Sequence, residues 1–331
     1  MRTRLSAEII VVCFLSLSVV DACAESLSPA AVNAAEFSGK TSRKAKLVLK
    51  NTKLILKAQI LLDRAGFSSG TIDAAKGSNF TKALAAFQRE NGLNDSGKLD
   101  EPTWSKLAAT SGEPVLTEYE ITRDDVRGPF EEIPDDWEKQ AQLKRLGYSG
   151  PRELLAEKFH MDESLLDRLN PNVAFNQAGT RIVVANVPQG AGKARAERVQ
   201  VNKKEWSVRV FDGSGKVIAF YPASVGSNEK PAPSGKHRIT RIVQNPVYVY
   251  NPAFGFPGVE IKKKLRIAPG PNNPVGSVWM NLTQHTYGIH GTAEPAKVGK
   301  VHSHGCVRLT NWDAMALAAM VKKGTAVEFV E

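Results

Sequence analysis

The chain has 331 residues, of which 42% are hydrophobic, and a formal net charge of +10. Residues 197–331 contain 18 basic and 9 acidic residues, so this last part holds +9 (18 minus 9) of the total. A basic region favours a polyanionic partner such as nucleic acid, anionic lipid or a carboxylate-rich wall polymer. The amino-terminal sequence argues against nucleic acid, because it predicts export.

Residues 1–24 have the three parts of an export signal: Arg2 and Arg4, an apolar run over residues 9–20, and small residues around Cys23. The apolar run is shorter than the roughly 20 residues that cross a bilayer as a helix. We therefore expect cleavage after residue 24 and a periplasmic, cell-wall-associated protein with no transmembrane segment. The residues before Cys23 also resemble a lipoprotein cleavage site, which would make Cys23 a lipid anchor.

Export makes the cysteine content informative. Cys13 and Cys23 lie in the leader, so Cys306 is the one cysteine that remains after cleavage. In an oxidising compartment an unpaired thiol is either buried and inert or retained for its reactivity. Composition alone leaves both readings open.

A polar lead-in over residues 25–51 precedes a segment, residues 52–110, whose apolar side chains recur at helical spacing. This segment predicts three helices, the third capped by Asp100. Its motifs resemble the peptidoglycan-binding-like domain of wall enzymes; they are Gln59, Leu62, Gly66-Phe67, Ile72-Asp73, Phe87-Gln88, Gly92-Leu93 and Thr103-Trp104. The family usually has Asp-Gly where this chain has Asp73-Ala74, so a structural spacer is the alternative to a ligand-binding unit.

Residues 111–134 are rich in Glu, Asp, Thr and Pro without helical periodicity, which predicts an extended connector. Residues 135–190 predict two short helices, the second capped by Asp162, and then a strand that begins at Arg181. This helix–helix–strand order resembles a LysM glycan-binding module.

From residue 197 apolar and polar residues alternate, which predicts strands in a mainly antiparallel sheet. Near the end, Thr310 or Asn311 is expected to cap a helix that stops at Gly324 and is followed by a last strand. The expected fold is thus multidomain: a mainly antiparallel β domain, preceded by a small three-helix unit and a small α+β module.

The residues around Cys306 carry the chemistry. A thiol that transfers an acyl group needs a base, donors for the oxyanion, and a group that places the substrate. His290 and His304 are candidate bases or pKa-lowering partners of the thiol. Gly305 allows close approach of the backbone to a substrate carbonyl, and Arg308 can hold a carboxylate with two hydrogen bonds.

Zinc binding is a competing interpretation, since His290, His302, His304 and Cys306 are all competent ligands. The alternate spacing of the last three differs from the usual ligand spacing, so we favour catalysis and expect no metal or organic cofactor.

The motif His290-Gly-Thr, a gap of 16 residues (306 minus 290), and Ser303-His-Gly-Cys-Val-Arg-Leu309 resemble the YkuD-type L,D-transpeptidase catalytic domain over residues 197–331. The resemblance implies a β-sandwich with Cys306 as nucleophile and His290 as general base, oriented by the Gly291 carbonyl. By the same resemblance His304 is a further catalytic residue. The residues that bind substrate or the oxyanion are Gly291, Ser303, Gly305 and Arg308, with Thr292 and Asn311 as weaker assignments.

The reaction implied is attack of Cys306 on the diaminopimelate carbonyl of a tetrapeptide stem, release of D-alanine, and transfer of the acyl group to an amine. The acceptor would be a second stem, an envelope protein or a D-amino acid, and glycan strands would bind the front units. An L,D-carboxypeptidase with the same site and a non-catalytic wall-binding protein are the alternatives. We further expect that deletion of residues 25–190 weakens action on the polymeric wall but spares action on small muropeptides.

Overall fold

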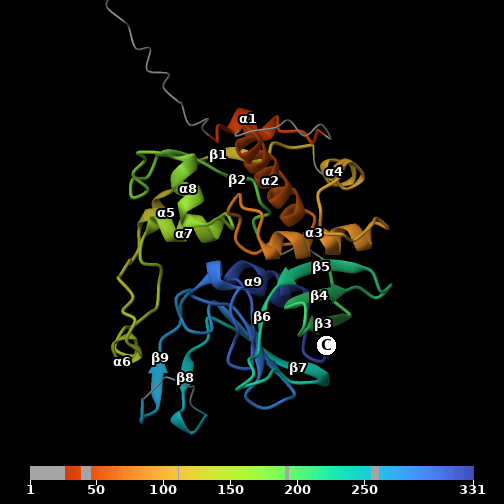
Figure 1. The fold of residues 1–331 in the computed structure, drawn as a ribbon. Helices are drawn as coiled ribbons and strands as arrows, with labels where there is room; N and C mark the ends of the chain where they lie inside the picture. The colour runs from red at the N-terminus through yellow and green to blue at the C-terminus, as the bar shows by residue number, and fades with distance from the viewer. Residues whose placement is uncertain (1–26, 39–45, 111, 191–193, 255–260) are drawn as a thin grey trace, which may run out of the picture.

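The computed structural model describes residues 27–38, 46–110, 112–190, 194–254 and 261–331. The expected leader and Cys23 lie outside these ranges. In the described part of the chain, no helix combines the length and the apolar character needed to cross a membrane. The helical segments occupy one half of the molecule and the large sheet the other (Figure 1).

The first unit is helical, as its apolar spacing predicts. Its three expected helices are α2 (Lys46–Arg64), α3 (Ser78–Glu90) and α4 (Glu101–Ala108). The expected polar lead-in at residues 25–51 is corrected, because it contains a further helix, α1 (Pro29–Asn33), and the start of α2. The Asp100 side chain accepts a hydrogen bond from the Thr103 backbone, so the expected cap of α4 is confirmed. The apolar core of this unit continues into buried residues between 115 and 187, and it also includes Phe220, which belongs to the large sheet.

The second unit corrects the expected connector at residues 111–134. This segment forms β1 (Leu116–Glu120) and α5 (Arg123–Val126), and β1 pairs antiparallel with β2 (Arg181–Ala185). Between the two strands lie α7 (Pro151–Lys158) and α8 (Glu163–Leu169), the latter capped by Asp162 as expected. The sequence did not predict this strand, because two of its three exposed residues are acidic and Leu116 is its one buried side chain.

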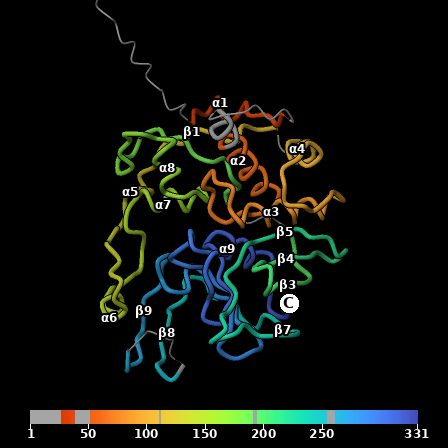
Figure 2. Tube along the Cα trace, viewed as in Figure 1, coloured from red at the N-terminus to blue at the C-terminus, as the bar shows by residue number. Residues whose placement is uncertain are grey.

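Residues 127–150, here called the arm, leave the second unit and run beside the β8–β9 hairpin (Figure 2). The arm contains α6 (Trp137–Gln140), and the hairpin consists of β8 (Tyr248–Tyr250) and β9 (Leu265–Ile267). The Trp137 ring packs edge-on against Tyr248 and Tyr250, with centroids 5.8 and 5.4 Å away. The arm therefore shares a small apolar core with the hairpin.

The β domain is built on a nine-stranded sheet of the described residues, in the order β5-β4-β3-β13-β7-β10-β11-β12-β6. Its strands are β3 (Arg198–Asn202), β4 (Ser207–Phe211), β5 (Val217–Pro222), β6 (Ser224–Val225), β7 (Gly235–Gln244), β10 (Val278–Leu282), β11 (Gly288–His290), β12 (Val307–Arg308) and β13 (Ala326–Val330). The β3–β13 and β11–β12 pairs are parallel and all other neighbouring pairs are antiparallel. The sheet is therefore mainly antiparallel, as the sequence predicts.

The sheet is continuous, which refines the expected sandwich. β7 pairs with β13 through its first residues and with β10 through its later ones, so it belongs to both halves. β5 and β6 stand at opposite ends of the strand order, yet Ala223 alone separates them in the chain. The sheet must therefore curl until its edges meet, and its two halves enclose one apolar core.

Helix α9 (Asn311–Met320) lies between the sheet and the front units (Figure 1). Thr310, one of the two expected caps, accepts a hydrogen bond from the Asp313 backbone. Trp312 stacks on His160 of the second unit, with ring centroids 5.3 Å apart, and Asp313 accepts a hydrogen bond from Ser68 of the first unit at 3.0 Å. All three parts of the chain are thus packed together at this helix.

Candidate active site

Two adjacent strands bring together the motifs that are 16 residues apart in sequence (306 minus 290). β11 and β12 are parallel, with Ile289 opposite Val307 and His290 opposite Arg308. Cys306 immediately precedes β12, and the Gly288 backbone forms a hydrogen bond with its thiol. The register therefore places the thiol, the imidazole and the guanidinium at the same end of a parallel strand pair.

The His290 side chain is buried and held in one orientation. Its Nδ1 lies 2.6 Å from the Gly291 carbonyl oxygen, and its ring stacks on Trp279, which is opposite it on β10, with centroids 5.2 Å apart. A carbonyl oxygen can only accept, so Nδ1 carries the proton and Nε2 keeps a lone pair. Burial, together with the charge of Arg308, lowers the pKa of His290 to about 3 even though the Gly291 hydrogen bond opposes this. His290 is therefore a neutral imidazole at neutral pH, able to act as a base.

Cys306 is half-buried, and its resting form is the thiol. Burial raises its pKa above the usual value, and this outweighs the Gly288 hydrogen bond and the charges of Lys230 and Arg308, which act in the opposite direction. Its Sγ also lies 3.8 Å from the Thr286 carbonyl oxygen. The geometry thus favours His290 as a base that takes the proton during attack, rather than as a cationic partner of a preformed thiolate.

Arg308 and His304 differ in their surroundings. Burial lowers the pKa of Arg308, and within the described residues its buried Nε has no hydrogen-bond partner. His304 is exposed; burial of part of its ring lowers its pKa, as do the charges of Arg308 and Lys230. Arg308 is therefore placed inside the site and His304 at its rim.

The turn before the thiol is fixed by two residues. Gly305 has a φ of +105°, which L side chains rarely adopt, and an added Cβ would lie 2.9 Å from Cε1 of Tyr287. The buried Ser303 hydroxyl donates to the Cys306 carbonyl oxygen, and the Ser303 backbone N–H donates to Gly226. Both residues hold the turn in shape, which is a structural basis for the motif beyond substrate approach.

The buried side chain of Asn311 joins backbone segments close to His290 through hydrogen bonds. Its Oδ1 accepts from the backbone N–H groups of Ser277 at 3.0 Å and Thr292 at 3.2 Å. A Cβ at Gly291 would lie 2.2 Å from this oxygen, so the close approach requires glycine there. Gly291, Thr292 and Asn311 therefore form one support for His290.

Sequence analysis missed residues that come from distant elements. Tyr248 of the β8–β9 hairpin is one, since burial and the neighbouring Cys306 raise its pKa. Trp279 beneath His290 and Glu157 beside Asn311 are others. No fixed spacing links these positions to the motifs, and only strand register or packing of α7 brings them close.

The zinc interpretation finds no site. In the described ranges, no three His, Cys, Asp or Glu side chains are grouped closely enough to hold a metal ion. His302 is turned away: its Nδ1 lies 3.1 Å from the Gly226 carbonyl oxygen, and its ring packs on Trp206.

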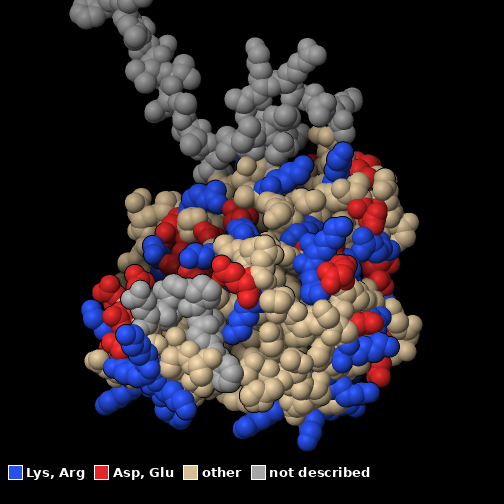
Figure 3. Space-filling model, turned by 60° about the horizontal axis from the view of Figure 1, so that its bottom comes forward, with Lys and Arg blue, Asp and Glu red and all other residues tan. Residues whose placement is uncertain are grey.

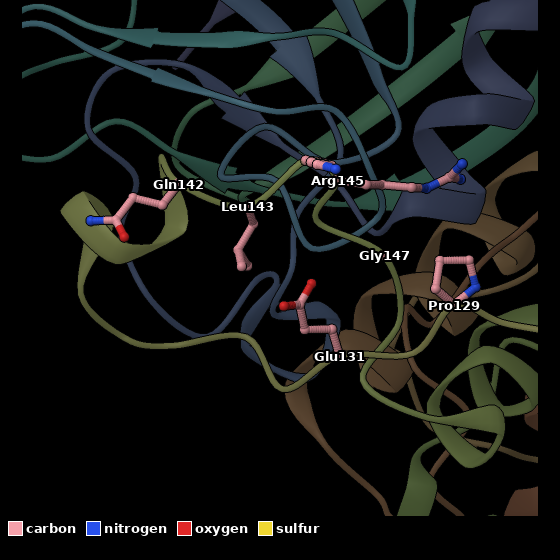
Figure 4. A pocket seen from close by; sticks show the side chains of 7 residues that line it. Pro129, Glu131, Gln142, Leu143, Arg145 and Gly147 are labelled. Atoms are coloured by element: carbon pink, nitrogen blue, oxygen red, sulfur yellow. The ribbon is translucent and has the colours of Figure 1, made fainter.

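A hollow of about 400 Å³ lies in the arm, apart from the residues just described. Its lining consists of Pro129, Glu131, Gln142, Leu143, Lys144, Arg145 and Gly147 (Figure 4). The lower face of the β domain carries Lys and Arg along its rim, with few acidic side chains (Figure 3), in agreement with the charge of residues 197–331.

Comparison with known proteins finds family matches in two separate regions of the chain. Residues 196–329 match the model of the L,D-transpeptidase catalytic domain, and residues 51–107 match the "Putative peptidoglycan binding domain". The chain is 28% identical over 174 residues to "Putative L,D-transpeptidase YkuD" of Bacillus subtilis, covering 52% of this chain and 89% of that protein. It is 30% identical over 134 residues to "Putative L,D-transpeptidase YqjB" of the same organism, covering 39% of this chain and 68% of that one.

Among solved structures, L,D-transpeptidase 3 from Mycobacterium tuberculosis aligns with a TM-score of 0.35 at 17% identity, covering 46% of this chain and 76% of that chain.

Proposed function

Because the chain belongs to the L,D-transpeptidase family, we propose that Cys306 is the nucleophile that carries the acyl group and His290 the base that activates it. One observation carries this assignment: the Gly291 carbonyl fixes the tautomer of a buried, neutral His290 beside the strand that begins just after Cys306. A neutral imidazole with its Nε2 lone pair available is the form that a general base requires.

In the first step, His290 Nε2 takes the thiol proton as Cys306 Sγ bonds to the diaminopimelate carbonyl carbon of a tetrapeptide stem. The tetrahedral intermediate collapses, the bond to the terminal D-alanine breaks, and its nitrogen receives the proton from His290. A thioester remains on Cys306. In the second step an amine attacks the thioester and gives its proton to His290, which passes it to the departing Cys306 thiolate, so that the resting site is restored and no cofactor is consumed.

The other residues have supporting roles in the proposal. Arg308 binds a substrate carboxylate, for which its buried Nε offers a donor. The turn from His304 to Cys306 supplies backbone N–H groups for the oxyanion, since the Ser303 N–H donates to Gly226. His304, at the rim, contacts the donor peptide, and Thr292 and Asn311 hold the base from below.

The front units are proposed to bind peptidoglycan. The first matches a peptidoglycan-binding model. The second, with two helices between an antiparallel strand pair, has an arrangement that supports a LysM-like assignment, now including β1 at residues 116–120. Such ligands imply a periplasmic or wall-associated location after removal of residues 1–24. A lipid anchor at Cys23 is a further proposal from the sequence alone.

The test uses the mature protein and its Cys306→Ala variant with a purified disaccharide-tetrapeptide. Intact-protein mass, released D-alanine and muropeptide products are followed together. We expect a thioester adduct, D-alanine and a cross-linked dimer with the wild type alone. D-alanine and tripeptide without dimer would favour the L,D-carboxypeptidase alternative or another acceptor, such as an envelope protein. Turnover by the Cys306→Ala variant would refute the assignment of the nucleophile.

A further inference from the structure

Glu157 on α7 of the second unit reaches into the β domain, outside the residues that match the catalytic family model. Its side chain is buried, and both of its carboxyl oxygens lie 3.1 Å from Nδ2 of Asn311. The Tyr148 hydroxyl donates to Oε2 of the same carboxyl group at 3.3 Å. A side chain from the second unit is therefore bonded directly to the support of the candidate active site.

This contact is one of four that set which way the Asn311 amide faces. The Asn311 NH2 group donates to Glu157 and, at 3.1 Å, to the Pro271 carbonyl oxygen, while Oδ1 accepts from Ser277 and Thr292. If the amide turned over, its NH2 would face two backbone N–H groups and its oxygen would face two acceptors. Glu157 therefore favours the orientation in which Oδ1 points at the Thr292 N–H.

The Thr292 N–H and the Gly291 carbonyl belong to one planar peptide group. Asn311 holds the N–H end at 3.2 Å, and the carbonyl end lies 2.6 Å from Nδ1 of His290. Rotation of this peptide plane would move both hydrogen bonds together. The orientation of the Asn311 amide is thus linked to the tautomer of His290 through a single rigid group.

We propose that Glu157 is a positioning residue for the acyl transfer, acting through Asn311 and the Gly291–Thr292 peptide to hold His290 as the Nδ1–H tautomer. The inference rests on the proposed function, in which His290 is the base. The second unit is then part of the machinery that sets the reaction rate, in addition to any role in binding the wall.

The negative charge of Glu157 is not what this role needs. Burial raises its pKa to about 8, as do the nearby charges of Glu153 and Glu163, against the hydrogen bonds from Asn311 and Tyr148. A protonated carboxyl still has an oxygen that accepts from Asn311. Glutamine, which has the same length and one amide oxygen, should therefore replace it.

The experiment compares Glu157→Met, which keeps the volume and removes the acceptor, with Glu157→Gln. Glu153→Gln is the matched control: this residue lies on the same helix and accepts from Asn272 of the β domain at 2.7 Å, but it does not contact Asn311. The full-length variants are labelled with 15N-histidine, the tautomer of His290 is read by NMR, and kcat and KM are measured with the disaccharide-tetrapeptide.

For Glu157→Met we expect a mixture of His290 tautomers and a kcat about tenfold lower with unchanged KM, equivalent to ~1.4 kcal/mol. Glu157→Gln and Glu153→Gln should stay within about twofold of wild type, the scale below which coupled positions have little effect. If Glu157→Met does not fold, Glu157→Ala takes its place in the same assays.

Two results would overturn the proposal: a single Nδ1–H tautomer with wild-type kcat in the variant that lacks the acceptor, or equal losses in that variant and Glu153→Gln. Failure of the proposed function would look different, because an inactive wild type would still show whether the His290 tautomer depends on Glu157.

Discussion

The two front units contact the β domain in different ways. The first unit covers an edge of the sheet: Gly66 and Ser68 bond to the backbone of Phe220 on β5, and Asn79 Nδ2 donates to the Val298 carbonyl oxygen at 2.8 Å. The second unit instead touches the start of α9 through Glu157 at Asn311, and the β8–β9 hairpin through the arm.

Because of this difference, we expect the two units to contribute differently to the stability of the β domain and to the rate of its reaction. Covering an edge strand satisfies backbone groups and buries apolar surface, which contributes to the free energy of unfolding. Holding the loops beside His290 and the hairpin beside Cys306 sets geometry that the reaction uses. The first unit should therefore govern mainly stability, and the second should govern stability and rate.

The largest effect is expected from deletion of residues 25–190. In contrast to the expectation from sequence, we expect that small muropeptides are no longer processed, because the deletion uncovers Phe220, Trp312 and Tyr250, each less than a tenth exposed. Uncovering side chains of this size costs roughly 1.5–3 kcal/mol each, against a total stability of about 5–15 kcal/mol. We expect loss of activity on polymer and on muropeptide alike, measured by D-alanine release and by circular dichroism of the fragment.

A fragment that begins at residue 112 sharpens this test, since it removes the first unit and keeps the arm and Glu157. Where it folds, it should retain kcat on muropeptides. Full activity on muropeptides of the protein that lacks residues 25–190 would show that neither front unit supports the chemistry.

The parts of this molecule that sequence could predict are those with local signals. Helix caps such as Asp100, Asp162 and Thr310 rest on hydrogen bonds to the next turn, and apolar periodicity marks α3 and the strands. The chemistry around Cys306 was predicted because its residues lie within a short stretch. The closeness of that stretch to His290 came from family resemblance, and the strand register accounts for it physically.

The parts that could not be predicted depend on contacts between distant segments. β1 has acidic exposed positions and is recognisable only when paired with β2. Glu157 looks like an ordinary surface residue of an amphipathic helix, since nothing in its own neighbourhood shows that Asn311, 154 residues later, will bury it. The packing of three units on α9 has no local signal either.

A pH effect of intermediate size is expected where both units meet α9. Asp313 is buried near Asp63, His160 and Tyr221, and accepts from Ser68; burial, with the charge of Asp63, raises its pKa from 3.8 to about 7. Burial lowers the pKa of His160, but its contacts with Asp63 and Asp313 raise it overall. A raised pKa means that the folded state binds the proton more tightly, so this contribution is complete below pH 3.8 and is lost as pH rises through about 7.

We therefore expect Tm to fall between pH 5 and pH 8, with Asp313 contributing up to about 3 kcal/mol of lost stability over this window. Calorimetry of wild type and Asp313→Asn checks this, and the variant should show the shallower fall. Asp124→Asn, on the exposed α5, is the control and should follow the wild type. The carboxyl of Asp125, whose pKa its partners lower to about 2, titrates below this window. Parallel curves for wild type and Asp313→Asn would exclude Asp313 as a source of the pH dependence.

The smallest effect, and the one that tests the comparison most directly, is expected from Ser68→Ala. The Ser68 hydroxyl donates to Asp313 at 3.0 Å and accepts from the Gly70 backbone at 2.9 Å, and both contacts are buried. Their loss should cost about 1–3 kcal/mol in urea unfolding. Because neither contact leads to Asn311 or His290, kcat on muropeptides should stay within about twofold of wild type. A fall in kcat as large as that expected for Glu157→Met would mean that the first unit also affects the reaction rate. The two units would then differ in where they contact the β domain, but not in what they contribute.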